Sequence, residues 1–173
     1  MAVTRIVSVE DARELASVLR ANREFLAPWD ARRDDGYFTV AGQRAGLERA
    51  LNAYARGTMV PLVIIDEDGS LVGRVNINNV VRGAFQSADV GYWLSQSSNG
   101  RGLATAAVAD AIGIAFGQLG LHRLQAGTLL HNARSQRVLI RNGFRPFAVA
   151  PDYLKIDDRW QDHILFHLFN PEA

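Results

Sequence analysis

The pattern of hydrophobic and polar positions divides the chain into helix-like and strand-like segments. Long Pro-free stretches with recurring apolar positions predict helices over residues 11–22, 40–56, 103–119 and 132–142. Short runs rich in β-branched and aromatic residues predict seven strands, over residues 4–9, 59–65, 70–78, 87–95, 122–128, 144–149 and 161–169. The order βααβββαβαββ, in 173 residues without repeats or linkers, predicts one α+β domain over residues 1–173.

Turn and cap residues mark several boundaries between these elements. Ser8 or Asp11 is placed to cap the first helix, and Asp66-Glu67-Asp68-Gly69 is typical of a hairpin turn. We expect residues 25–29 to interrupt helical periodicity, with Ala27-Pro28 as an extended or turn dipeptide. Polar residues 30–37 are expected to form a loop.

Composition narrows the functional classes. The sequence is 48% hydrophobic and 21% charged, and it has no apolar run long enough to cross a bilayer and no signal-peptide core, so we expect a cytoplasmic protein without a membrane partner. It contains no cysteine, which excludes a disulfide framework, a cysteine nucleophile and a cysteine metal site. A formal net charge of +1 gives no overall attraction to nucleic acid.

The segment Asn99-Gly100-Arg101-Gly102-Leu103-Ala104-Thr105 joins a predicted strand to a predicted helix. Its two glycines permit positive φ and close approach of a ligand to the backbone. The first N–H groups of the helix lack internal acceptors and carry partial positive charge. The turn therefore predicts a phosphate or pyrophosphate site, although its spacing matches neither a Walker loop nor a three-glycine dinucleotide motif.

A second segment, Asn132-Ala133-Arg134-Ser135, opens a helix that ends at Asn142-Gly143-Phe144. Asn132 is a favourable N-cap, and Gly143 stands where a left-handed C-cap is expected. Together the two segments resemble the GCN5-related N-acetyltransferase (GNAT) superfamily, whose motifs are Arg/Gln-x-x-Gly-x-Gly/Ala and Asn-x-x-Ser/Ala followed by Gly-Phe. Asn99 departs from the Arg/Gln position, whereas Gly102 and Ala104 match.

The resemblance implies a GNAT fold: a mixed, mostly antiparallel seven-stranded sheet, splayed at the cofactor site and flanked by about four helices. It implies acetyl-coenzyme A as acyl donor and no metal. The donor site is then assigned to Trp93, Leu94, Asn99, Gly100, Arg101, Gly102, Leu103, Ala104, Thr105, Asn132, Ser135 and Arg137. Arg134, Arg137 and Arg141 share a helix face that could meet the 3′-phosphate, as could Arg101, or that face could simply be solvated.

Further stretches are similar to the RimJ/RimL group of ribosomal-protein N-acetyltransferases, with the closer likeness to RimJ. They include residues 22–26 with Pro28-Trp29, residues 79–83, and residues 152–154 with 160–163. This resemblance implies acetylation of the α-amine of a protein N-terminus, of the ribosomal-protein alanine type. The alternatives are a small-amine or antibiotic N-acetyltransferase on the same fold and a non-catalytic acyl-coenzyme A-binding module.

The chemistry predicted is direct attack of a neutral amine on the thioester in a ternary complex. Many members of the superfamily have a tyrosine acid at the position of Leu139, so that acid is absent here. The resemblance to the RimL-like branch then implies that Ser135 protonates the thiolate. Alternatively, Ser135 is only a small residue at a tight contact between the helix and the cofactor. Asp89 or Asp152 is predicted as the base, with solvent or a water chain as the further alternative.

Aromatic and amide side chains are predicted to line the acceptor cleft. The candidates are Phe25, Trp29, Asn76, Asn78, Tyr92 and Tyr153, with Trp93 as a further aromatic wall. Phe25 and Trp93 are equally compatible with core packing, and the two asparagines with a solvent-facing strand. The four histidines are scattered without a metal-ligand spacing, and only His163 is expected to reach the cleft.

Overall fold

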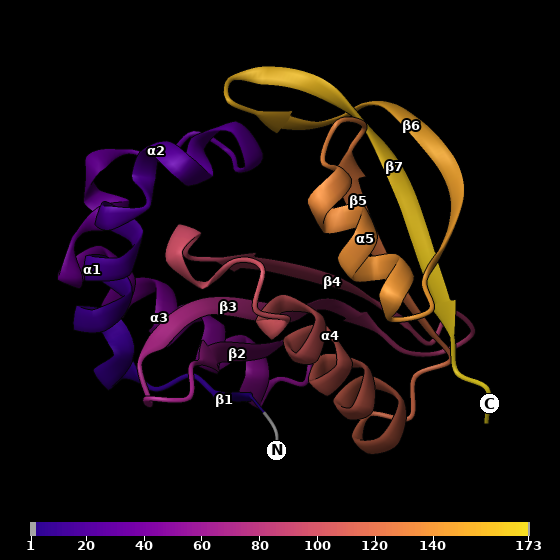
Figure 1. The fold of residues 1–173 in the computed structure, drawn as a ribbon. Coiled ribbons are helices and arrows are strands. Elements are labelled where there is room, and N and C mark those ends of the chain that lie inside the picture. Colours follow the sequence, from indigo (N-terminus) through magenta and orange to yellow (C-terminus); the bar gives the residue numbers. More distant parts are fainter. Residues whose placement is uncertain (1–2, 173) are drawn as a thin grey trace.

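The computed structural model describes residues 3–172, and their centre is a seven-stranded sheet in the order β1-β2-β3-β4-β5-β7-β6 (Figure 1). Neighbouring strands are antiparallel, except for the parallel pair β4 and β5. The strands are β1 (Thr4–Ile6), β2 (Val60–Ile65), β3 (Leu71–Val81), β4 (Ser87–Leu94), β5 (Arg123–Leu129), β6 (Arg145–Ile156) and β7 (Arg159–Phe169). The predicted mixed seven-stranded sheet is confirmed.

Five α-helices flank the sheet, against about four expected, because residues 23–26 form a helical turn of their own. They are α1 (Ala12–Ala21), α2 (Arg23–Leu26), α3 (Val40–Ala55), α4 (Leu103–Gly113) and α5 (Ala133–Arg141). Within the described residues, none of these helices combines the length and the apolar character needed to span a bilayer.

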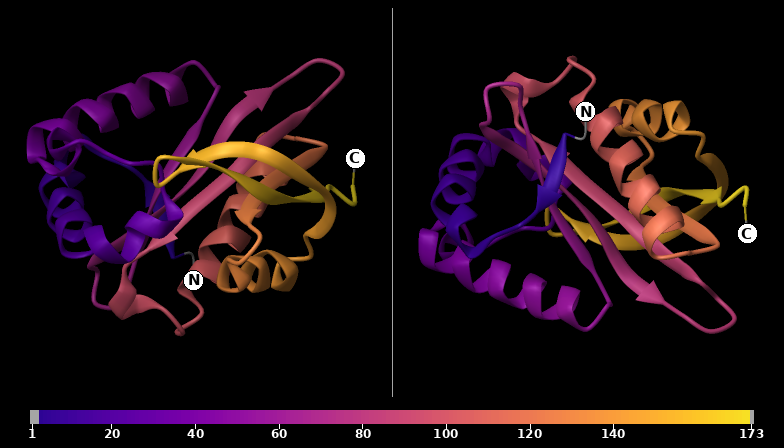
Figure 2. Two further views of the ribbon diagram at one scale, coloured as in Figure 1. Left: turned by 90° about the horizontal axis from the view of Figure 1, so that it is seen from above. Right: turned by 90° about the horizontal axis from the view of Figure 1, so that it is seen from below.

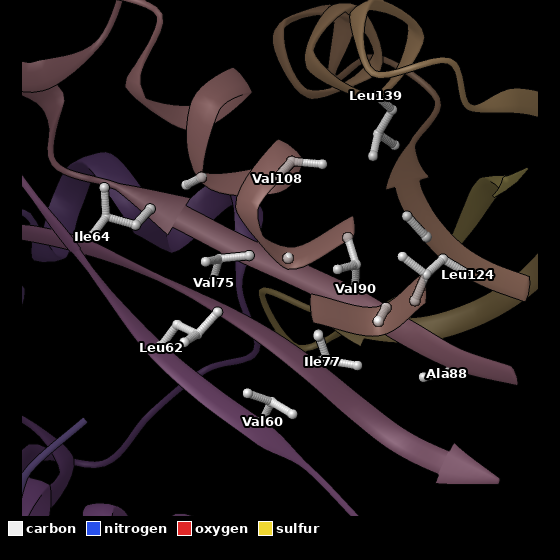
Figure 3. Close-up of a cluster of buried hydrophobic side chains, with 14 of the residues drawn as sticks. Val60, Leu62, Ile64, Val75, Ile77, Ala88, Val90, Val108, Leu124 and Leu139 are labelled. Carbon is white, nitrogen blue, oxygen red and sulfur yellow. The ribbon is translucent and has the colours of Figure 1, made fainter. Parts of the chain in front are cut away.

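Strand alternation sends side chains to two cores on opposite faces of the sheet. Leu62 and Ile64 join the larger core, which also holds Val108 of α4 and Leu139 of α5 (Figure 3). Val63, between them, joins the smaller core with residues of α1 and α3. Helices α1 and α3 therefore cover one face of the sheet, and α4 and α5 cover the other.

The parallel pairing of β4 with β5 is short, and this opens the sheet. Only Ser87, Ala88 and Asp89 of β4 pair with β5, the last opposite Gln125, although β4 continues to Leu94. Beyond Asp89 the two strands separate. The splay expected from the family resemblance is therefore present between the carboxyl ends of β4 and β5.

The β6–β7 hairpin is longer than the sequence predicts. Both predicted strands are present, but β6 continues to Ile156 and β7 already begins at Arg159. In the turn between them, Asp157 and Asp158 have φ of 47° and 60°. Almost all of β6 is exposed, and its pairing is interrupted between Ala150 and Leu154. An exposed edge strand gives no buried alternation, and so its sequence pattern is weak.

The hairpin reaches across the molecule toward the segment that follows α2 (Figures 1 and 2). The Asp157 amide donates to the Asp30 carbonyl at 3.3 Å, and Arg32 pairs with Asp158 at 2.8 Å. The turn between β6 and β7 thus contacts the segment after α2, although the two are far apart in the sequence.

Residues 27–29 form a 3₁₀ turn after α2, which is the turn alternative expected at Ala27-Pro28. Two local predictions need correction. Residues 35–38 form another 3₁₀ turn inside the expected loop. The helix expected over 103–119 is α-helical only to Gly113 and continues as a π-helix over Ile114–Gln118. Of the two proposed caps, Ser8 caps the 3₁₀ turn Val9–Asp11 that leads into α1 and forms a capping box with Asp11, whereas Asp11 holds the N-cap position of α1 without a side-chain cap bond.

Candidate active-site cleft

A cleft of about 920 Å³ opens where β4 and β5 separate. Both halves of the sheet and the segments over both faces contribute to its lining. The predicted site residues among those that line it are Phe25, Trp29, Asn76, Tyr92, Trp93, Leu94, Asn99, Ala104, Asn132, Ser135 and Arg137. The fold therefore brings together most of the donor and acceptor residues that the sequence singles out.

The β4–α4 loop has the backbone geometry that the phosphate-site prediction requires. Gly100 and Gly102 have φ of 80° and 83°, in the left-handed region that favours glycine. Gly102 is the N-cap of α4 and offers no side-chain cap, which leaves the first amides of the helix for another acceptor. Thr105 is half-buried in the first turn, whereas the Leu103 side chain packs into the larger core, so only its backbone can serve a ligand.

Asn99 contributes to the loop itself, since its Nδ2 donates to the Ser95 carbonyl at 2.8 Å. Arg101 points elsewhere: its Nη2 lies 2.9 Å from Asp66 Oδ1, in the β2–β3 turn. Arg134 and Arg137 of α5 line the cleft and are exposed, whereas Arg141 is not part of the lining. Two of the three arginines on this helix face thus line the same cleft as Asn99 and Ala104 of the β4–α4 loop.

At the start of α5, Asn132 accepts a hydrogen bond from the Ser135 amide at 3.1 Å, which confirms it as the N-cap. The Ser135 hydroxyl lies 2.7 Å from the Tyr92 hydroxyl of β4. Burial raises the pKa of Tyr92 to about 12, although its hydrogen bond with Ser135 opposes the shift. Tyr92 is therefore a neutral phenol at physiological pH that contacts the predicted acid, a contact that the sequence did not indicate.

The acceptor side of the cleft lies toward α1 and α2. Phe25 is half-buried there and Trp29 is 38% exposed. Trp93 lines the cleft and also packs against the smaller core. Asn76 borders the cleft, whereas Asn78 and Tyr153 are not part of its lining.

Arg74 of β3 is a cleft residue that sequence reasoning missed. Its Nη2 donates to Asn76 Oδ1 at 3.2 Å, and its buried Nε has no partner within residues 3–172. Burial lowers the pKa of the guanidinium, but arginine stays charged at neutral pH. A mostly buried cation without a carboxylate in contact is suited to an oxygen acceptor on a ligand.

Thr128 of β5 is a second residue of this kind. It lines the cleft, and its buried Oγ1 lacks a hydrogen-bond partner within the described part of the chain. Both residues occupy ordinary alternating strand positions, so no sequence motif marked them.

The two aspartates predicted as the base lie outside the lining of the cleft. The Asp89 carboxylate accepts a hydrogen bond from Asn79 Nδ2 at 2.9 Å. Asp152 is exposed in the irregular part of β6, where its amide donates to Asp162 at 3.0 Å. His131 and His163 line the cleft instead. Over residues 3–172, no group of three or more metal-ligating side chains is present.

Comparison with known proteins agrees with the family resemblance of the sequence motifs. The family model described as Acetyltransferase (GNAT) domain matches residues 3–145. The [ribosomal protein uS5]-alanine N-acetyltransferase of Escherichia coli is 36% identical over 171 residues, which cover 98% of this chain and 88% of that protein.

Two solved structures have the same fold at a TM-score of 0.93. One is the ribosomal-protein-S5-alanine acetyltransferase from Vibrio fischeri, 30% identical, with 98% of this chain and 93% of that chain covered. The other is Mycobacterium smegmatis RimJ in complex with CoA-disulfide, 33% identical, with 98% and 82% covered. The family model and the relative both match most of this chain, and the splayed sheet beside a glycine-rich helix start agrees with them. This chain belongs to the GNAT family of acetyltransferases.

Proposed function

We propose that this protein transfers the acetyl group of acetyl-coenzyme A to the N-terminal α-amine of a ribosomal protein in the cytoplasm, with alanine as the first residue. The observation that carries the proposal is one cleft with two different sides. The β4–α4 loop, here called the donor loop, contributes Asn99 and Ala104 to one side, and the aromatic side chains of Phe25 and Trp29 line the other. The similarity to uS5-alanine acetyltransferases over 98% of the chain supports the choice of acceptor.

The chemistry of the donor side suits the coenzyme. Phosphate oxygens match the free amides at the start of α4 and the exposed guanidinium groups of Arg134 and Arg137. The pantetheine arm carries amide groups, which match the polar atoms of Asn132 and Thr128 along the splay. The thioester oxygen would accept from a backbone amide of β4 near Trp93, freed where β4 leaves β5.

Transfer requires the acceptor nitrogen to be neutral, because only its lone pair attacks the thioester carbon. A C–N bond then forms, the C–S bond breaks, and the sulfur leaves with the electron pair. Ser135 supplies a proton to that sulfur and regains one from the acetylated nitrogen, with Tyr92 holding the serine hydroxyl in place. Asp89 and Asp152 remain the predictions from sequence for the base that neutralises the incoming amine.

On the acceptor side, an extended N-terminus presents carbonyl oxygens close to its α-amine. Arg74 would donate to such a carbonyl, with Asn76 bordering the same position. Phe25 and Trp29 would flank the first side chain. A small first residue such as alanine fits beside these rings with little steric demand.

The test is an acetylation assay that follows thiol release with a panel of acceptors. The panel contains peptides that begin with Ala, Ser or Met, the same peptides with blocked α-amines, and a set of aminoglycosides and polyamines. We expect transfer to free Ala termini and none to the blocked peptides. Transfer confined to small amines would contradict the protein-acceptor assignment, and donor binding without any transfer would contradict the enzymatic one.

A further inference from the structure

The acceptor amine must lose a proton before it attacks, and few groups in the cleft are able to take it. The titratable residues that line the cleft are Asp30, Arg33, Tyr37, Arg74, Tyr92, His131, Arg134, Arg137 and His163. The four arginines stay protonated. Burial raises the pKa of both tyrosines, so they also keep their protons at neutral pH.

Asp30 is the one carboxylate in that set, and it is already engaged. Its two oxygens accept from Arg33 at 3.1 and 3.3 Å and from the Ala31 amide at 2.8 Å. His131 is exposed to solvent at the outer edge, where its ring packs 5.4 Å from that of Trp29. His163, by contrast, is 3% exposed. His163 is thus the buried imidazole of the cleft.

The hydrogen bonding of His163 fixes which nitrogen carries the lone pair. Its Nδ1 lies 2.9 Å from the Gln161 carbonyl oxygen, which only accepts, and therefore Nδ1 carries the hydrogen. Nε2 is then the acceptor, and within residues 3–172 no hydrogen bond to Nε2 is present. The backbone of β7 itself holds the ring in the tautomer that a base requires.

The ring also lies where the sheet opens. Gly127 of β5 follows, by two residues, the last position paired with β4. His163 shares a face of β7 with Leu165, the partner of Gly127. A Cβ on Gly127 would lie 3.7 Å from His163 Cδ2, and the missing side chain leaves space beside the imidazole.

We propose that Nε2 of His163 accepts the proton of the acceptor α-ammonium. The ammonium becomes a neutral amine, the imidazole becomes imidazolium, and the imidazolium releases its proton to solvent after transfer. A second proton leaves the nitrogen during transfer and reaches the sulfur through Ser135. The steps together yield the acetylated amine, the free thiol and one proton. This inference rests on the proposed acetyl transfer and assigns its base.

The test compares His163→Asn with the wild type on an Ala-initiated peptide at pH 7. Asn keeps a donor for the Gln161 carbonyl but lacks Nε2. We expect kcat to fall about 100-fold, as is typical when a general base is lost, with acetyl-coenzyme A affinity unchanged. His122→Gln, which removes an exposed histidine outside the cleft, should stay within about twofold of wild type, because nothing in the reaction requires it.

The decisive arm uses the same peptide with trifluoroalanine first, whose α-amine is already neutral at pH 7. The His163→Asn deficit should shrink to less than about fivefold there, and likewise at pH 9.5 with alanine, since a free α-amine loses its proton near pH 8. An equal deficit on both peptides, or none on either, would overturn the proposal.

Two other outcomes call for a different variant or a different substrate. If His163→Asn is inactive on both peptides and also fails to bind acetyl-coenzyme A, His163→Gln replaces it in the same comparison. If the wild type acetylates only small amines, the proposed acceptor is wrong, and a matched pair of fluorinated and unfluorinated small amines tests His163 in the same way.

Discussion

The two sides of the cleft are built in different ways. The donor side comes from two short segments, residues 99–105 and 132–135, each of which carries its own turn glycine or helix cap. The proposed acceptor side is assembled from residues of α1, α2, β3 and β7, which are far apart in the sequence. The proposed phosphate site on the donor side consists of backbone amides, whereas the acceptor side consists mainly of side chains.

Because of this difference, we expect single substitutions to act differently on the two sides of the cleft. A donor made of backbone amides fails only when the backbone or the space before it changes. An acceptor side made of side chains loses one contact at a time. We therefore expect all-or-none effects at the donor loop and graded effects across the acceptor side.

The largest expected effect is at Gly102. In Gly102→Glu, a side chain on a residue at φ 83° strains the loop and brings negative charge to the helix start. We expect acetyl-coenzyme A affinity to weaken by at least about 100-fold, measured by calorimetry. Gly120→Glu is the matched control, because Gly120 also has positive φ with open space around it but, unlike Gly102, does not cap the start of a helix. Equal affinity in the two variants would contradict the loop assignment.

The next effect concerns the contact between Ser135 and Tyr92. Ser135→Ala removes the proposed proton donor, so kcat should fall about 100-fold while donor affinity is kept. Tyr92→Phe leaves the serine hydroxyl without its positioning partner, and we expect a loss of about tenfold. Single-turnover rates of both variants and of the double variant measure this. A Ser135→Ala enzyme with the wild-type kcat would reduce Ser135 to a packing residue.

A smaller, graded effect is expected at Arg74. Arg74→Gln removes the charge-assisted donor for an acceptor carbonyl, and KM for the Ala peptide should rise about tenfold. KM for acetyl-coenzyme A should not change. Arg13→Gln, an exposed arginine on α1, controls for the loss of one positive charge. The assignment fails if Arg74→Gln raises KM equally for the peptide and for an alkylamine without a carbonyl.

The smallest effect on activity is expected at Asp11, which joins β1 to α1. Burial by itself raises the pKa of Asp11, but its hydrogen bonds from Arg5 and from the Ser8 amide hold the pKa below its usual value. The folded form therefore binds protons less readily than the unfolded chain, so this stabilisation is present at neutral pH and is lost as the pH falls through the folded pKa.

Asp11→Asn should lower Tm at pH 7 by a few degrees with kcat unchanged. The difference from wild type should narrow below about pH 4, where the unfolded carboxyl takes up its proton. Glu48→Gln, an exposed carboxylate on α3, should leave Tm unchanged at both pH values. A Tm difference for Asp11→Asn that does not depend on pH would show that the charge contributes nothing.

Most elements were predictable because their signals are local. The caps Ser8 and Asn132 and the left-handed glycines at 100 and 102 follow from short-range rules. The full length of β6 was not predictable, because an exposed edge strand lacks the alternation that burial imposes. The contact between Tyr92 and Ser135 joins residues 43 positions apart, beyond the reach of any periodicity argument.

The turn before α4 and the cap of α5 were predictable from the residues alone, because glycine spacing and helix capping depend on a few neighbouring residues. Which side chains line the cleft depends on the fold of the whole chain. Arg74 and His163 on the proposed acceptor side, and Thr128 on the proposed donor side, occupy unremarkable strand positions, and they line one cleft because β4 and β5 part after Asp89. Register and strand order bring such groups together, and both arise from packing over the whole chain rather than from local preference.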